Sequence, residues 1–155
     1  MKFIILPEDH KAKNASLTYS KEWGSFGTEP LSALDVGGSS ILINDLQLEI
    51  DDEGKILYVW GYCPLIRYEK TNETPEHYIC HGLQVILDKE IIPGISTRLN
   101  EGNPWPRYIN PKTGWVCIGN PVTQHTSMIE FAPDSIATMQ GDQIIAVWLH
   151  PKWEP

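Results

Sequence analysis

The chain has 155 residues, of which 41% are hydrophobic and 21% are charged, an ordinary globular balance, and we expect a single domain over residues 1–155. Twenty acidic residues against twelve basic ones give a formal net charge of −8. This charge argues against nucleic acid or an anionic membrane surface as the main ligand, because both require a basic binding surface. It permits a basic protein partner.

The three cysteines, Cys63, Cys80 and Cys117, are widely spaced and form no CxxC pair. Reduced thiols in a cytoplasmic protein are the simplest interpretation. The apolar run over residues 3–6 is too short for the core of a signal peptide, and no later run approaches the length of a membrane span. We therefore expect a cytoplasmic protein that does not enter a membrane.

Short apolar segments separated by turn residues run through the chain, and twelve glycines and twelve prolines favour short strands over long helices. Residues 8–30 are predicted to be an ordered loop with a helical turn near 12–17, and residues 31–36 a strand or an irregular segment. Residues 91–110 are predicted to be irregular because prolines and glycines interrupt them. Strands are predicted over residues 2–6, 40–44, 46–51, 56–62, 77–87, 115–118, 127–131, 133–140 (with a short helix as the alternative) and 143–150. We expect an all-β fold, an antiparallel β-sandwich or open barrel of about eight short strands with little helix.

The clearest signal is a β-hairpin over residues 46–62, whose two possible registers differ in what they expose. If Asp51 lies opposite Lys55, with a Gly54 bulge, then Ile56, Tyr58 and Trp60 share the buried face of Leu46, Leu48 and Ile50. A shift by one residue instead places Tyr58, Trp60 and Tyr62 beside Gln47, Glu49 and Asp51, as an aromatic and acidic outer face. We favour the first register, because Asp51 opposite Lys55 is a favourable charge pair.

Motifs for catalysis and cofactor binding are absent from the sequence. It contains no Gly-x-Ser-x-Gly elbow, no P-loop and no Gly-x-Gly-x-x-Gly. Among histidines and cysteines only His77, Cys80 and His81 are close together, and on a strand Cys80 would face away from the two histidines. We predict no enzymatic activity, no cofactor and no metal.

Two features point to binding. Acidic residues gather at the hairpin turn and in the EKTNETPE segment, residues 69–76. Six tryptophans are present, and large aromatic side chains contribute strongly to binding interfaces. Trp60, Trp115 and Trp148 lie in predicted strands and are expected in the core, whereas Trp23, Trp105 and Trp153 lie in loops or near the end of the chain.

With its acidic hairpin and EKTNETPE loop, the chain resembles the immunity proteins that bacteria make against polymorphic or contact-dependent growth-inhibition toxins. The resemblance implies a protein-binding inhibitor that neutralises a basic, nuclease-type toxin by covering its active site with an acidic surface. The residues expected to contact this partner are Asp51, Asp52, Glu53, Glu69, Glu73, Glu76, Trp105 and Tyr108.

Two other functions remain open. A small-ligand or carbohydrate-binding β module would stack a ligand on Trp105, Tyr108 and Trp23. A hydrolase would use His81 or His125 with a carboxylate, and it would require a pocket that holds one of these histidines beside an Asp or Glu.

Overall fold

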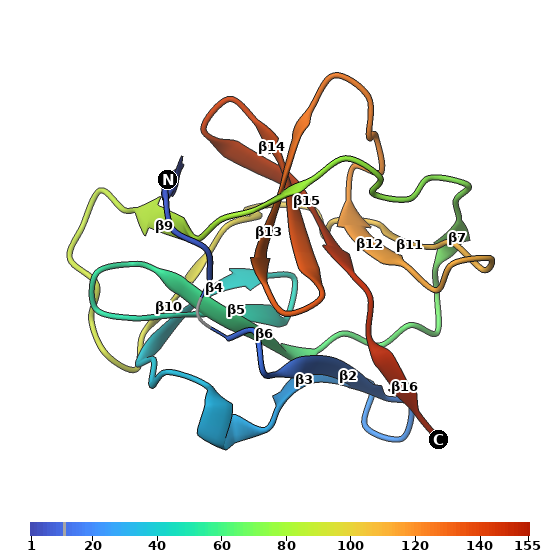
Figure 1. Ribbon diagram of the computed structural model, residues 1–155, viewed down its shortest axis with the longest axis horizontal. Coiled ribbons are helices and arrows are strands. Elements are labelled where there is room, and N and C mark those ends of the chain that lie inside the picture. The colour runs from blue at the N-terminus through green and yellow to red at the C-terminus, as the bar shows by residue number, and fades with distance from the viewer. Residues whose placement is uncertain (11) are drawn as a thin grey trace.

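The computed structural model describes residues 1–10 and 12–155, and Figure 1 shows an all-β sandwich. Within these residues the only helical element is the 3-10 turn η1 (Leu31–Ala33). Two seven-stranded sheets form the layers, and a small two-stranded sheet pairs β1 (Lys2–Ile5) with β9 (Leu83–Ile86). The predicted fold class is confirmed, with more and shorter strands than the sequence patterns indicated.

Sheet 1 is built around the predicted hairpin and lies below sheet 2 in Figure 1. In spatial order its strands are β10 (Ser96–Arg98), β4 (Ser39–Ile43), β5 (Leu46–Ile50), β6 (Ile56–Tyr62), β3 (Ser25–Glu29), β2 (Ser16–Ser20) and β16 (Lys152–Glu154). Sheet 2 contains β7 (Glu69–Lys70), β11 (Arg107–Ile109), β12 (Val116–Gly119), β15 (Gln143–Leu149), β14 (Ser135–Gln140), β13 (Ser127–Ala132) and β8 (Ile79–Cys80).

The edge strands of both sheets differ from the strands inside them. Each has two or three residues, and each pairs in parallel with its neighbour: β10 with β4, β16 with β2, β7 with β11 and β8 with β13. The interior pairs are antiparallel. The edges are therefore made by short pieces of connecting segments laid beside an antiparallel centre.

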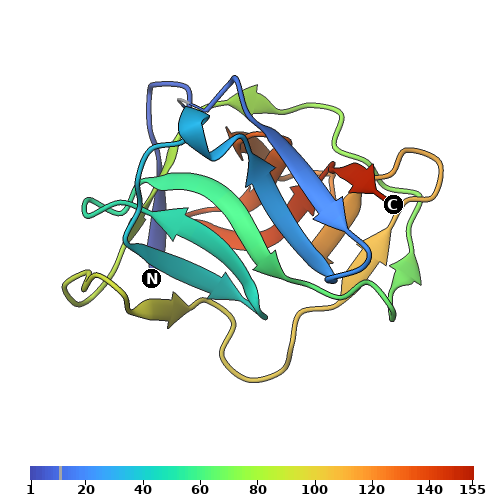
Figure 2. The ribbon, with the colours of Figure 1, turned by 90° about the horizontal axis from the view of Figure 1, so that it is seen from below.

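The main core lies between the two sheets, and a smaller cluster lies on the other face of sheet 2. Alternate residues of β5 (Leu46, Leu48 and Ile50) are buried in the main core, as the period-2 pattern predicts. Trp148 is fully buried in the smaller cluster with Cys117 and Ile136, and Tyr108 and Trp115 pack against it. Sheet 2 is thus buried on both faces. Figure 2 looks onto the outer face of sheet 1, with the strands of sheet 2 behind it.

Several sequence-based predictions are wrong in detail. The predicted loop over residues 8–30 contains the hairpin β2–β3, whose Leu17, Tyr19 and Phe26 enter the core. The predicted helical turn near 12–17 is a non-helical turn at residues 13–14, closed by the Ala15 amide donating to the Ala12 carbonyl, and β2 begins at Ser16. The predicted strand 77–87 is split between β8 and β9, which belong to different sheets, and the segment 91–110 contributes β10 and β11. The strand alternative for residues 133–140 is confirmed as β14.

Candidate functional site

A β-bulge in β6 decides which side chains face outward. At the turn, the Asp51 amide donates to the Lys55 carbonyl and Ile50 pairs with Ile56, as in the favoured register. Leu57 is then an extra residue, because Glu49 pairs with Tyr58. Beyond the bulge the pairing follows the other register, and the prediction that Trp60 lies in the core is wrong.

The bulge creates an aromatic row on the outer face of sheet 1, formed by Tyr58, Trp60 and Tyr62. Trp60 is 38% exposed, Tyr62 is 55% exposed and Tyr58 is half-buried. Alternate residues of a strand are about 6.8 Å apart, so the three rings form an extended strip. Ser25 of the neighbouring β3 pairs with Tyr62.

Polar groups of β5 lie beside the aromatic row. Trp60 Nε1 donates to Glu49 Oε1 at 3.0 Å, and Gln47 pairs with Trp60 across the strands. Desolvation, together with the nearby negative charge of Glu49, raises the pKa of Tyr58, which therefore stays a neutral hydroxyl at neutral pH. This face combines apolar rings with fixed hydrogen-bonding groups, the composition found at the centre of binding interfaces.

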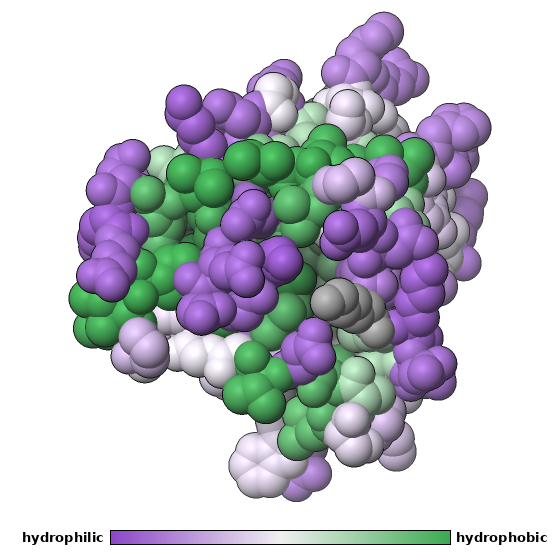
Figure 3. Space-filling view, turned by 60° about the vertical axis from the view of Figure 1, so that its left-hand side comes forward, coloured by the Kyte–Doolittle hydropathy of each residue, from purple (hydrophilic) through white to green (hydrophobic). Residues whose placement is uncertain are grey.

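An acidic pocket of about 230 Å³ lies at the start of β6, where Ile56 and Leu57 line it. Among the described residues, the ionisable groups that line it are the carboxylates Glu8, Asp9, Asp35, Asp51 and Glu53, with Lys55 and the imidazole of His10. Asp51 Oδ1 accepts hydrogen bonds from the amides of Glu53 and Lys55, both at 2.9 Å, so Asp51 shapes the turn as well as adding charge. Figure 3 views this side of the molecule, where hydrophilic side chains border apolar patches.

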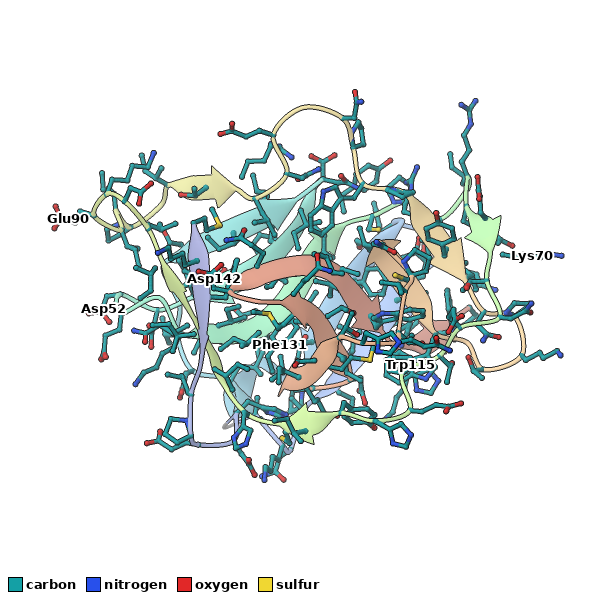
Figure 4. All side chains as sticks on the ribbon, turned by 90° about the horizontal axis from the view of Figure 1, so that it is seen from above. Asp52, Lys70, Glu90, Trp115, Phe131 and Asp142 are labelled. Atoms are coloured by element: carbon teal, nitrogen blue, oxygen red, sulfur yellow. The ribbon has the colours of Figure 1, made fainter. Side chains whose placement is uncertain are left out.

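The carboxylates predicted to contact a partner are not all on one surface. Asp51 and Glu53 line the acidic pocket, and Asp52 is exposed at the tip of the same turn. Glu69 lies in β7, and Figure 4 shows its neighbour Lys70 at the opposite end of the molecule from Asp52. Glu73 and Glu76 line a separate polar pocket, where Glu73 Oε2 accepts a hydrogen bond from Thr123 at 2.8 Å.

The two aromatic residues predicted to contact a partner, Trp105 and Tyr108, both pack against buried clusters of the protein. The amide of Trp105 donates to Asn44 Oδ1 at 2.9 Å, Asn44 Nδ2 donates to the Trp105 carbonyl at 3.0 Å, and the half-buried ring packs against the main core. Tyr108 packs against the smaller cluster. Sequence reasoning instead missed Glu8, Asp9, His10 and Asp35. It had identified the face of Tyr58, Trp60 and Tyr62, but only as the less favoured register.

The two histidines of the hydrolase alternative lie apart. His81 is half-buried and lines neither the acidic pocket nor the polar pocket, and its Nδ1 has no hydrogen-bond partner among the described residues. His125 lies in an exposed environment. His125 lines the polar pocket of about 530 Å³ with Glu73, Glu76 and His77, and all four residues are exposed. General acid–base catalysis is typically tuned by burial or by a close charged partner. This pocket supplies no burial, and among the described residues no hydrogen bond joins His125 to either glutamate.

A group of potential metal ligands lies at the edge of sheet 2. His10, Cys80 and Glu130 each place one ligand atom within 4.8 Å of the others. Burial raises the pKa of the Cys80 thiol, and the nearby carboxylates of Glu130 and Asp9 add to this effect. The grouping differs from the one considered in the sequence, because Cys80 meets His10 and not His77.

Comparison with known proteins gives no relative: no family model, no curated protein and no solved structure matches this chain. Among the residues that the structure describes, no helix is long and apolar enough to cross a membrane.

Proposed function

We propose that this chain is a protein-binding inhibitor of the immunity-protein kind, which acts in the cytoplasm and covers the basic active-site region of a toxin. The observation that supports this proposal is that the strand β6 carries an exposed aromatic row and, at its start, lines an acidic pocket. The binding surface is then the outer face of sheet 1 with the acidic pocket, in place of the composite surface expected from the sequence.

The two parts of this surface would make different contributions. Exposed Trp and Tyr side chains supply most of the binding free energy when they enter a pocket of the partner and water is excluded. The carboxylates at the rim speed the encounter with a basic partner and make its rate sensitive to salt. Seven strands about 4.8 Å apart and about five residues long form a face of roughly 500 Å². With the pocket added, this approaches the roughly 800 Å² per partner of a standard interface.

Capture from a lysate of the source cells tests the proposal. Tagged chain is incubated at low and at moderate salt, and bound proteins are identified by mass spectrometry. We expect one stoichiometric, basic protein whose recovery is lost with Trp60→Ala and reduced with Glu53→Lys. Val122→Ala is the matched control, since Val122 is 38% exposed, like Trp60, but lies in the β12–β13 loop of sheet 2. Glu69→Lys controls for charge at the opposite end. Equal recovery with Trp60→Ala and wild type would refute this placement.

The carbohydrate-binding alternative is favoured by one observation, the strip of rings with the amide of Gln47 and the carboxylate of Glu49 beside it. Such a strip resembles a platform on which sugar rings stack. If no protein is captured at either salt, a glycan array read by tryptophan fluorescence becomes the deciding measurement. A glycan that binds wild type but not Trp60→Ala would replace the inhibitor proposal.

A further inference from the structure

Three separate segments bring His10, Cys80 and Glu130 together. Cys80 of β8 pairs with Glu130 of β13 in a parallel register, which places their side chains side by side. The segment after β1 is tied to the link between β8 and β9, because the Leu6 amide donates to the Gly82 carbonyl at 2.9 Å and the Gly82 amide donates to the Glu8 carbonyl at 2.7 Å. This brings His10 to the same place.

The imidazole ring of His10 is buried, although the residues before it in the same segment are exposed. His10 is 8% exposed, and its Nε2 lies 3.2 Å from Glu130 Oε1. Its other ring nitrogen, Nδ1, is buried and has no hydrogen-bond partner within the described part of the chain. A buried imidazole nitrogen without a partner is unfavourable, and native proteins rarely leave one. Nε2, which faces Glu130, is the nitrogen placed to bind an ion in this group, and its contact with Glu130 is the one side-chain hydrogen bond of the ring among the described residues.

We propose that His10, Cys80 and Glu130 bind a divalent ion of the zinc class. Thiolate, imidazole and carboxylate together are a ligand set that Zn²⁺ accepts, whereas Mg²⁺ and Ca²⁺ prefer oxygen ligands alone. Around a tetrahedral zinc, ligand atoms lie roughly 3.5 Å apart. The 3.2 Å between His10 and Glu130 already suits this geometry, and the remaining separations of up to 4.8 Å need to contract by about an ångström.

Such an ion would join the segment between β1 and β2 to the β8 edge of sheet 2. Three protein ligands leave a fourth position of the tetrahedron for water or another group. The ligands of this site are contributed by β8, β13 and the segment after β1, and none comes from the aromatic row. The site adjoins the proposed interface, because His10 also lines the acidic pocket.

The test is titration of the full chain, stripped of metal and reduced, with Co²⁺ and then with Zn²⁺. We expect one equivalent of Co²⁺ to produce a near-ultraviolet thiolate-to-cobalt charge-transfer band, and Zn²⁺ to displace it. Cys80→Ser should abolish the band. Glu130→Gln, which keeps the size of the side chain, should weaken Zn²⁺ binding about 10- to 100-fold.

His77→Gln is the matched control. The exposed polar pocket with His77, His125, Glu73 and Glu76 is a competing place for adventitious metal, and it contains no cysteine among its lining residues. We expect His77→Gln to leave the band unchanged. Absence of a thiolate band in folded wild type, a band that persists in Cys80→Ser, or loss of binding in His77→Gln would each overturn the proposal. Circular dichroism establishes that each variant is folded, and if Cys80→Ser does not fold, the response of Glu130→Gln decides.

Discussion

The bulge at Leu57 makes a quantitative prediction about two tryptophans. Trp148 is fully buried, and truncation of such a side chain typically costs about 3 to 5 kcal/mol of unfolding free energy. Trp60 is 38% exposed and makes one exposed hydrogen bond, to Glu49, together with cross-strand contacts. These contributions sum to about 1 kcal/mol. Trp60→Ala should therefore cost several-fold less than Trp148→Ala.

Urea unfolding followed by circular dichroism measures this difference for the two variants and wild type. In a chain of this size, about 1 kcal/mol corresponds to a fall in Tm of about 2 to 4 °C. The urea concentration at the unfolding midpoint should stay close to that of wild type for Trp60→Ala and should fall steeply for Trp148→Ala. Equal losses would place Trp60 in the core, restore the unbulged register and remove the central residue of the proposed binding face.

Three further predictions concern the backbone and the thiols. Asn44→Ala should lower the free energy of unfolding, measured in urea, by about 2 to 4 kcal/mol, because Asn44 has φ 54° and its side chain holds the Trp105 backbone. Asn44→Gly should be about 1 kcal/mol more stable than Asn44→Ala, since glycine adopts a positive φ without strain. Equal stability of the two variants would exclude a contribution from backbone conformation. Gly54→Ala should cost about 2 kcal/mol or more in the same assay, since φ is +87° and an added Cβ would collide with the Val85 carbonyl; a neutral result would mean that the turn has another shape. In native protein at pH 8 only Cys80 should react readily with Ellman's reagent. Burial raises the pKa of Cys63 to about 11, so the thiolate fraction of Cys63 at this pH is on the order of 10⁻³. Cys117 is fully buried, and burial raises the pKa of its thiol as well. All three thiols should react after denaturation, and fast reaction of two native thiols would contradict the described core.

The fold class followed from composition and turn spacing, whereas the exposed face did not. β6 is apolar on both sides, so its period gave no reason to choose which side chains are buried. The charge pair of Asp51 with Lys55 correctly indicated the turn, but it does not determine the strand register beyond the bulge at Leu57.

The hairpin β2–β3 was missed because β2 carries only two core side chains and β3 only one, among serines, threonines and glycine. Burial against sheet 2 provides the stabilisation that local propensity does not. The ligand group at His10, Cys80 and Glu130 was missed for a different reason. Its members are separated by 70 and 50 positions and meet only through the pairing of β8 with β13 and the path of the segment after β1.

The short parallel strands at the sheet edges have a consequence for how copies of this chain meet. A long, straight edge strand offers a row of unpaired amides and carbonyls to another copy, and this is the usual beginning of strand addition and fibril growth. Here the outermost strands of the two seven-stranded sheets have two or three residues each before the chain turns away. An incoming strand would find too few consecutive hydrogen-bonding groups to align with, which protects an all-β protein of this size from edge-to-edge aggregation at high concentration.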